Sequence, residues 1–568
     1  MRNILSYFKA NKIQSLIVLA CILLAIKYIF VDFGIDAAFQ ISMSYRFVNG
    51  DVMFREMWEP YQTSTFLCAI LIRMYMGIFH TTKGIVLFLQ FAGVMIDLGI
   101  AVFLYKTVMR YSLADRNAAF AMSLVFFLIS PKDVALPEYA NMQVWFTLLL
   151  GLFLFIYHNS GKRIYLVLAA LSLCMAILAY PSCLLLFLAA SGFLLKNRDK
   201  KGALLFSLIC VLTGIGFFVF LFLQGLSLAE ILSSIHYILG IETSHSMGMA
   251  DKLIWYFKTS STIVVLFLAI FALIHFVFAL MAGHGKRLTK NQEKAFADLI
   301  FLGVILCIGI YVTVQCIRYT RCAYAIIFVA LVVVGFRSRK KLNDNQSVFY
   351  YICLLLSVGE FVGTLMLTNL GLIASLPYLL IAATVSFVPI SKMFIEDIDV
   401  LWLKRLRNGL VIASVLFLLG RNALLIRPYN GDVSSIFMVR GIVKDGPAFG
   451  LITEYMGAYM QNETMKEWKE YVPEDSNIYI VGEPLDTIPY LYSDTGISAP
   501  SLVPTPGYNE MIAEYWELNP DKYPDMVIVS CWYGDLHISE NSWIMQWIDE
   551  EFQPTYYVDG KYYRYYYR

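Results

Sequence analysis

The sequence predicts a polytopic α-helical membrane protein that ends in a small extracytoplasmic α/β domain. Hydrophobic residues make up 59% of the 568 residues and charged residues only 15%, well below the roughly 25% charge of an average soluble domain. Apolar stretches long enough to cross about 30 Å of hydrocarbon as helices recur along most of the chain. After Arg427 the character changes, with 22 Asp and Glu against 8 Lys and Arg. We therefore expect a membrane domain over residues 1–425 and a water-exposed domain over 426–568.

We expect thirteen membrane-spanning helices, bounded from the apolar stretches alone. The first follows Arg2, Lys9 and Lys12 and has no small-residue cleavage site, so we interpret it as a retained anchor. The thirteen segments are 13–31, 85–105, 118–130, 141–157, 163–179, 183–195, 203–223, 259–281, 296–314, 322–336, 347–368, 371–389 and 409–425.

One further apolar segment, Thr63 to Phe79, decides the topology. It is polar at its start and carries Arg73 in its middle, which favours a helix lying along the outer membrane interface. If it does not span, seven loops with 23 of the 44 Lys and Arg share one side: 1–12, 106–117, 158–162, 196–202, 282–295, 337–346 and 390–408. Because basic loops stay in the cytoplasm, we expect a cytoplasmic N-terminus and an outer tail in a bacterial plasma membrane.

The tail carries the pattern of a small α/β domain. Short apolar runs at 477–482 and 526–530, each bounded by turn residues, predict buried parallel strands. A helical stretch at 508–518 lies between them, and the tyrosine-rich run 562–567 predicts an aromatic edge strand. Cys531 is the only cysteine in this part, so no disulfide framework holds it together.

Several function classes find no support in the sequence. The charge distribution suggests no nucleic-acid partner. No Walker, GxGxxG, HExxH or Ser/His/Asp signature appears, which argues against NTPases, cytosolic-type dehydrogenases and intramembrane metalloproteases. Asp97 and Glu360 lie inside predicted spans, where ionisable groups are costly and are usually functional or paired. We interpret both as groups that form hydrogen bonds between helices.

The first outer loop, 32–84, is the most informative stretch. It contains an acidic residue after the first span, a helix with a basic residue, a Gly-Asp turn and a Glu-Pro step: Asp36, Arg46, Gly50-Asp51 and Glu59-Pro60. This order resembles the GT-C class of membrane glycosyltransferases, in particular the branch with protein mannosyltransferases and aminoarabinose transferases. The resemblance covers the span pattern to about residue 425. It implies a GT-C-like transmembrane fold with interfacial helices in the first loop, and an inverting glycosyltransferase that uses a polyprenyl-phosphate sugar.

Asp36 is the expected catalytic residue. Sugar transfer from a polyprenyl phosphate needs a carboxylate that takes the proton of the acceptor hydroxyl, and Asp36 stands at the outer mouth of the first span. The alternative is that Asp36 only caps the following helix, as Asp often does. Asp32 and Asp51 are interpreted as solvated loop residues.

Cations are expected to hold the departing phosphate. Arg318 and Arg321 stand three residues apart near the outer end of a span, and Lys132 stands in the second outer loop. The planar guanidinium of Arg suits phosphate, although these residues could equally reach lipid headgroups without a catalytic task. Arg46, Glu59 and Glu138 complete the expected substrate-binding set, the two glutamates orienting the sugar or the acceptor.

One departure from the resemblance concerns metal binding. Many relatives have an Asp just before the fourth span, where this chain has Asn141, with Glu138 three residues earlier. This favours a metal-independent mechanism: we expect no cofactor, and a divalent metal stays open as an alternative. His236, Glu242 and His245 in the third outer loop are interpreted as solvated residues.

The expected partners are a lipid-linked sugar donor, membrane lipid, and a glycan, lipid or protein acceptor in cell-surface glycan assembly. A rival interpretation is a transporter or lipid flippase, which predicts broken helices and more buried charges inside the membrane. A third is a catalytically silent relative that acts as a scaffold. The sequence leaves the sugar and the acceptor open.

Overall fold

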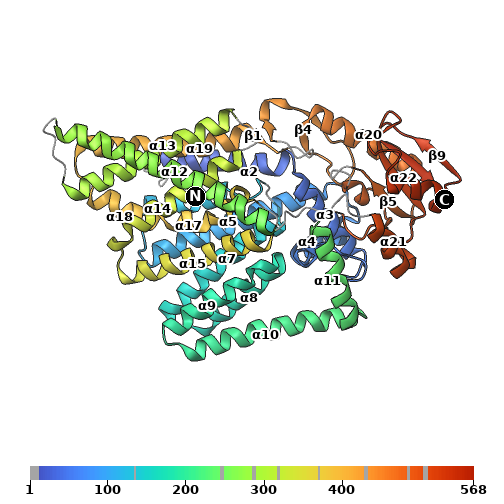
Figure 1. Cartoon of the computed structure of the whole chain (residues 1–568), viewed down its shortest axis with the longest axis horizontal. Coiled ribbons are helices and arrows are strands. Elements are labelled where there is room, and N and C mark those ends of the chain that lie inside the picture. The colour runs from blue at the N-terminus through green and yellow to red at the C-terminus, as the bar shows by residue number, and fades with distance from the viewer. Residues whose placement is uncertain are drawn as a thin grey trace.

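The computed structural model describes residues 12–133, 136–243, 249–283, 289–315, 320–368, 371–427, 433–482, 487–502 and 509–568. Most of these residues are helical. Figure 1 shows an elongated molecule in which a bundle of long helices occupies one end and a smaller part with strands occupies the other. We call the two ends of the bundle the sheet end, next to the strands, and the basic end, away from them.

Each segment predicted to span falls on one or more of the helices up to residue 425. Their bounds are α2 (Lys12–Phe30), α3 (Ile35–Val48), α4 (Thr65–Phe79), α5 (Ile85–Arg110), α6 (Arg116–Leu128), α7 (Tyr139–Ser160), α8 (Arg163–Ala179), α9 (Leu185–Lys196), α10 (Lys200–Leu223), α11 (Leu228–Thr243), α12 (Met249–Gly283), α13 (Lys290–Gln315), α14 (Thr320–Ser338), α15 (Asp344–Leu367), α16 (Leu372–Ser375), α17 (Leu380–Val385), α18 (Phe387–Glu396) and α19 (Leu401–Leu424).

Eight helices in the described part are long and apolar enough to cross a membrane: Lys12–Phe30, Gln62–Phe79, Ile85–Arg110, Tyr139–Ser160, Lys200–Leu223, Ala250–Leu280, Lys290–Gln315 and Asp344–Leu367. The predicted span 371–389 is broken, because the helices on either side of Ser386 meet at an angle of 44°. Counted as one span, this pair gives a ninth candidate. Several other predicted spans form shorter apolar helices, such as Arg163–Ala179.

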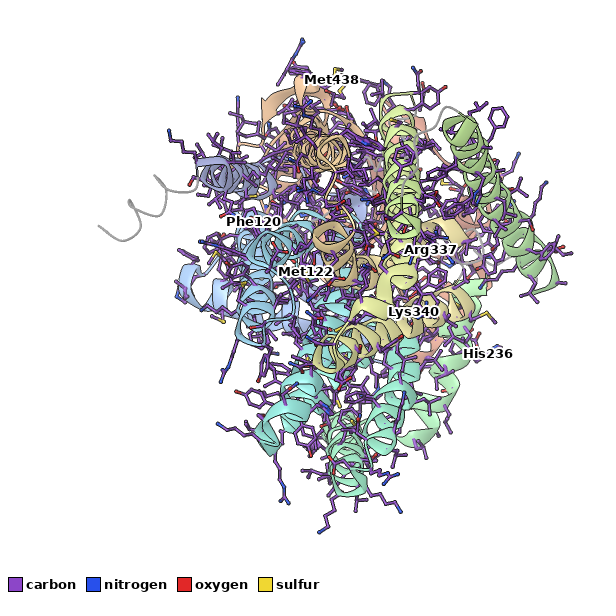
Figure 2. The ribbon with its side chains drawn as sticks, turned by 90° about the vertical axis from the view of Figure 1, so that its left-hand side faces the viewer. Phe120, Met122, His236, Arg337, Lys340 and Met438 are labelled. Atoms are coloured by element: carbon purple, nitrogen blue, oxygen red, sulfur yellow. The ribbon has the colours of Figure 1, made fainter. Side chains whose placement is uncertain are left out.

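The basic end gathers the loops that the sequence predicted to share one side. The Tyr157 hydroxyl donates to Asp199 at 2.6 Å, Arg337 pairs with Asp298 at 2.9 Å, and Gln346 donates to the Leu113 carbonyl at 2.8 Å. Figure 2 views the molecule from this end and labels Arg337 and Lys340 there. Phe155, near the end of α7, lies against Tyr111 and Phe349, with ring centroids 5.1 and 5.2 Å apart. The ends of five helix pairs therefore meet at one end of the bundle.

Local capping explains where several helices begin at this end. Asp115 accepts a hydrogen bond from the Asn117 N–H at 3.1 Å, and Asp199 accepts one from the Gly202 N–H at 2.8 Å. Asn343 forms a reciprocal capping box with Gln346 at the start of α15. These side chains satisfy N–H groups that have no partner within the first turn of a helix.

Helix α4, the segment that decides the topology, begins and ends at the sheet end. Thr63, at its start, donates to the Leu178 carbonyl at 2.7 Å, close to the end of α8. Beyond its other end, Thr82 donates to the Leu491 carbonyl in the tail at 2.8 Å, and Lys83 pairs with Asp445 at 2.8 Å. The chain has therefore not moved to the basic end between residues 63 and 83.

The tail contains the predicted α/β domain. Its elements are β1 (Leu425–Ile426), β2 (Ser434–Ser435), β3 (Val439–Ile442), β4 (Ile452–Glu454), α20 (Tyr455–Tyr471), β5 (Asn477–Val481), β6 (Gly496–Ile497), α21 (Asn509–Leu518), β7 (Met526–Trp532), β8 (Asp535–Leu536), α22 (Trp543–Trp547), β9 (Tyr556–Asp559) and β10 (Tyr563–Tyr567).

The main sheet has the order β6-β5-β7-β10-β9, with β8 paired to β7. Strands β5 and β7 are parallel, with Ile480 opposite Ile528, so the two predicted buried parallel strands are confirmed, and α21 is the helix predicted between them. The predicted edge strand at 562–567 is wrong: β10 lies inside the sheet, between β7 and β9. The edge is formed by β9, a short strand that the sequence analysis did not identify.

The tail packs against the first outer loop through many hydrogen bonds. The Trp58 N–H donates to the Pro500 carbonyl at 2.7 Å, and the Ser42 hydroxyl donates to the Thr487 carbonyl at 2.8 Å. Trp58 also stacks on Tyr237 of α11, with ring centroids 4.2 Å apart. The tail thus holds the loop that carries Asp36.

Candidate active site

Asp36 lies in the first turn of α3 at the sheet end. The helix is capped at its start by Gly34, whose backbone is extended (φ −79°, ψ 167°) and which provides no side-chain bond. Asp36 is inside the helix rather than at the cap, so the interpretation of Asp36 as a cap alone is wrong. Its position near the positive end of the helix dipole favours the ionised carboxylate.

Three side chains from distant segments meet the Asp36 carboxylate. The Lys132 ammonium lies 2.9 Å from Oδ1, the Tyr139 hydroxyl donates to Oδ1 at 3.3 Å, and Arg427 Nη2 lies 3.4 Å from Oδ2. Lys132 also donates to the Tyr139 hydroxyl. Exposure of the side chains of Asp36, Lys132 and Arg427 is 23%, 10% and 12%. The Asp36 side chain is therefore partly exposed, and the two cations are largely shielded from solvent.

Arg427 was missed in the sequence analysis. It lies at the beginning of the tail, directly after β1, and its guanidinium donates to the Lys132 carbonyl as well as to Asp36. Gly34 leaves room for it, since a Cβ at Gly34 would lie 3.3 Å from Cδ of Arg427. The available signal was a basic residue directly after the last predicted span on the outer side, where basic residues are less frequent.

The site contains two carboxyl groups whose pKa values move in opposite directions. Burial alone would raise the pKa of Asp36, but the charges of Lys132 and Arg427 and the hydrogen bonds from Lys132 and Tyr139 hold it below its ordinary value of 3.8. Burial raises the pKa of Glu138 to about 7, the nearby Asp36 charge adds to the rise, and Lys132 opposes it. Asp36 is thus an anion at neutral pH, while Glu138 exchanges a proton near neutrality.

Glu138 begins helix α7. One carboxyl oxygen accepts the Asn141 N–H at 2.9 Å, and the other, Oε2, is buried without a hydrogen bond among the residues described. The Asn141 amide donates to the Leu136 carbonyl at 2.9 Å. Asn141, which departs from the expected Asp, therefore shapes the loop that carries Lys132 and Glu138.

An aromatic wall adjoins the carboxylate through Tyr139. The rings of Tyr61, Tyr139 and Tyr180 form a cluster: the Tyr61 centroid lies 4.5 Å from that of Tyr139 and 5.1 Å from that of Tyr180, which are themselves 6.0 Å apart. The Tyr180 hydroxyl donates to the Tyr61 hydroxyl at 3.3 Å. Such rings offer flat faces with hydroxyl groups at their edges, which suits a ligand with both apolar and polar faces.

A cavity of about 60 Å³ adjoins Arg427. Its lining includes Lys27, Asp32, Asp133, Arg421 and Arg427. Arg421 holds Asp133 through two bonds of 2.9 and 3.1 Å. Asp32 is bonded by the Thr453 hydroxyl, and burial raises its pKa to about 7. Asp32 is buried between the loop and the tail, so its interpretation as a solvated residue is wrong.

Two of the predicted substrate-binding residues lie in a different cluster. Arg46 is fully buried and pairs with Asp51 at 2.7 Å and Glu59 at 3.0 Å. Lys522 from the tail pairs with Asp51 at 2.5 Å. Arg46 and Glu59 are thus engaged with each other, and their cluster joins the first outer loop to the tail. Asp51, too, is buried rather than solvated.

The remaining predicted residues cannot be placed against Asp36. Arg318, Glu242 and His245 lie outside the residues, or the side chains, that the structure describes, and so does the side chain of Arg321. His236 is an exposed residue of α11, as Figure 2 also shows at the edge of the molecule. Of the predicted set, the structure brings Asp36, Lys132 and Glu138 together.

The described residues contain no group of three or more His, Cys, Asp or Glu side chains arranged to hold a metal ion. No protein-family model matches the chain, and no curated protein matches it. Any assignment of function therefore depends on the geometry around Asp36.

Proposed function

We propose that the protein is an inverting glycosyltransferase that moves a sugar from a polyprenyl-phosphate carrier to an acceptor at the outer face of a bacterial plasma membrane. The observation that carries this proposal is the Asp36 carboxylate, kept ionised by Lys132 and Arg427 on a side chain that is partly exposed at the sheet end. Long apolar helices support the membrane location.

The proposed step makes one bond and breaks one. The oxygen of the acceptor hydroxyl bonds to the anomeric carbon as the bond from that carbon to the phosphate oxygen breaks, and the phosphate leaves with the bonding pair. Asp36 takes the hydroxyl proton. A carboxylate with a lowered pKa is a weak base, but the hydroxyl becomes strongly acidic once its oxygen bonds to the electron-poor carbon. Proton transfer to Asp36 therefore comes late in the step.

Lys132 and Arg427 have two roles in this proposal. In the resting site they keep Asp36 ionised. As the phosphate leaves, negative charge develops on its oxygen close to Asp36. The N–H groups of Lys132 and Arg427 stabilise this charge, which is the usual task of cations at such sites. Glu138, with a pKa of about 7, can receive or return a proton near neutral pH. Arg318 and Arg321 remain expected phosphate ligands.

We further propose thirteen membrane crossings, with the basic end in the cytoplasm and the tail outside. The meeting of the basic loops at one end supports this topology. So does α4, which begins and ends at the sheet end and fits a helix along the outer interface. An odd number of crossings then separates the cytoplasmic N-terminus from the tail.

A transporter or lipid flippase is the second candidate function. Glu360 is fully buried in α15, and neither of its carboxyl oxygens has a hydrogen bond among the residues described, so the hydrogen bond between helices expected for it is not found. The break between α17 and α18, with its angle of 44°, also fits the broken helices of transporters. A transferase can have both features, but a buried acidic side chain and a broken membrane helix are typical of transporters.

Purified protein in liposomes with a polyprenyl-phosphate sugar and a panel of acceptors distinguishes the two functions. A transferase splits the lipid, so free polyprenyl phosphate appears in proportion to the sugar on the acceptor. A flippase moves the donor between leaflets intact. Movement of intact donor without any polyprenyl phosphate, under each acceptor, would contradict the proposed transferase.

A further inference from the structure

An exposed apolar patch lies at the outer end of the last membrane helix. It consists of Phe437, Met438, Tyr455 and Met456, whose exposed fractions are 74%, 55%, 65% and 49%. We call it the Phe437 patch. Phe437 and Met438 belong to a short 3-10 turn, Ile436–Met438, that joins β2 to β3. Figure 2 shows Met438 at the rim of the molecule, projecting away from the bundle.

Strand pairing brings the two halves of the patch together. In the β3/β4 pair, Val439 is opposite Glu454. Met438 precedes the first of these residues and Tyr455 follows the second, so the antiparallel register places Met438 next to Tyr455. Met438 and Tyr455 therefore lie side by side, with Phe437 and Met456 adjacent to them along the chain.

A second strand pair fixes this surface to the end of α19. Helix α19 ends at Leu424, and β1, which follows it at once, pairs with β2 so that Leu425 is opposite Ser435. The turn with Phe437 comes directly after Ser435 and packs against α19. The patch therefore lies within a few residues of the C-terminal end of α19.

The exposed apolar face of α19 is continuous with the patch. Ile412, Leu416 and Leu424 are exposed by 59%, 65% and 47%, and their spacing in multiples of four puts them on one face of the helix. Arg440, two residues after Met438, is exposed as well. An apolar surface with a basic side chain beside it, at the end of a membrane helix, has the character of a membrane-interface anchor.

We propose that the Phe437 patch inserts into the outer leaflet of the membrane and seats the tail on the lipid surface. The proposal rests on α19 crossing the membrane, as in the topology above, and does not depend on sugar transfer. Arg440 then lies at the level of the lipid phosphates. Val433, which precedes β2, lines the cavity beside Arg427. Insertion of the patch therefore holds this cavity at the depth of the lipid headgroups.

Fluorescence quenching by lipid tests the insertion directly. Single cysteines replace Met438, Leu416 or Tyr557 in a full-length chain whose native cysteines have been changed to serine or alanine, and each is labelled with an environment-sensitive fluorophore. The labelled proteins are placed in nanodiscs with lipids brominated at shallow acyl positions. Leu416 represents the lipid face of α19. Tyr557 is a matched control, an aromatic residue of β9 with 54% exposure at the far end of the molecule in Figure 1.

We expect quenching and a blue-shifted emission at Met438→Cys, of a size close to that at Leu416→Cys, and neither change at Tyr557→Cys. Quenching at Met438→Cys as weak as at Tyr557→Cys would overturn the proposal and leave the patch in water. Absence of quenching at Leu416→Cys would overturn it as well, because α19 would not be in the membrane.

Discussion

The sequence leaves two interpretations of Asp36 open, a helix cap and a catalytic carboxylate, and its partners in the structure distinguish them. An aspartate at the beginning of a helix is a common cap, and the same pattern fits a catalytic carboxylate. In the structure Gly34 stands at the cap, and the Asp36 carboxylate is directed to Lys132, Tyr139 and Arg427. Two cations around one carboxylate have no role in capping. This arrangement keeps the carboxylate charged and oriented.

Sequence reasoning identified part of the site and missed the rest for a physical reason. Asp36 was found because it follows the first predicted span, and Lys132 and Glu138 because they are charged residues of the short second loop. Arg427 lies 391 residues from Asp36 along the chain, and no local pattern states that α19 ends beside α3. Arg46 and Glu59 were assigned to substrate, yet their opposite charges pair with each other in a buried cluster.

Gly34→Val should lower sugar transfer while keeping every charged residue of the site. The backbone of Gly34 is extended, which valine accepts, but its side chain would push Arg427 away from Asp36. A charge-assisted hydrogen bond contributes about 1.5–3 kcal/mol, so we expect a loss of about 10- to 100-fold in the transfer rate. Gly192→Val, where no atom lies within 4 Å of the added Cβ, is the control. Equal rates for the two variants would show that the position of Arg427 does not matter.

Glu138 should make stability depend on pH. Its folded-state pKa is about 7, above the value of about 4.3 for an unfolded glutamate. The folded state therefore holds the proton more tightly, and the stability that this provides is complete below about pH 4.3 and is lost as the pH rises to about 7. Glu138→Gln keeps an oxygen to cap α7 but cannot titrate. The thermal unfolding midpoint of the native protein should fall relative to that of Glu138→Gln between pH 5 and 7.5, and parallel curves would contradict the raised pKa.

At the scale of elements, the helices were easier to predict than the strands. A chain in hydrocarbon must satisfy its own backbone hydrogen bonds, so long apolar stretches become helices, and every predicted segment is helical in the structure. The break at Ser386 was not predicted, although Pro389 was the available signal, because a proline has no N–H to donate and clashes with the carbonyl four residues before it. The order of the strands was not predicted. The tyrosine-rich sequence of β10 suggested an edge strand, and the actual edge strand, β9, has only four residues, Tyr556–Asp559.

The position of α4 can be tested by thiol labelling in intact cells. A cysteine in place of the exposed Thr81, on a background without native cysteines, should react with a membrane-impermeant reagent from outside, because both ends of α4 lie at the sheet end. Lys340→Cys, at the basic end in Figure 2, should react only after the membrane is permeabilised. If Thr81→Cys is protected until permeabilisation, α4 crosses the membrane and the topology reverses.

At the scale of the molecule, the apolar part (1–425) and the acidic part (426–568) differ in composition but are in direct contact. A boundary at residue 425 separates apolar helices from acidic sequence, but Lys522, Thr453 and Arg427 of the second part contact Asp51, Asp32 and Asp36 of the first. Through these contacts, side chains of the tail bind three acidic residues of the first outer loop. The candidate active site therefore belongs to both parts, and the tail is a structural component of it.

The release of polyprenyl phosphate by Asp36→Asn, measured beside the native protein with a lipid-linked sugar and an accepted acceptor, tests the central claim most directly. An amide keeps the shape of the side chain but cannot take the acceptor's proton, so we expect release to fall by about 10²- to 10⁴-fold while donor binding changes little. Because the amide leaves Lys132 and Arg427 without their counter-ion, thermal stability should fall as well, and release is compared at a temperature where both proteins are folded. Asp344→Asn, an exposed acid at the basic end, should behave as the native protein. Native rates of release by Asp36→Asn would contradict the account.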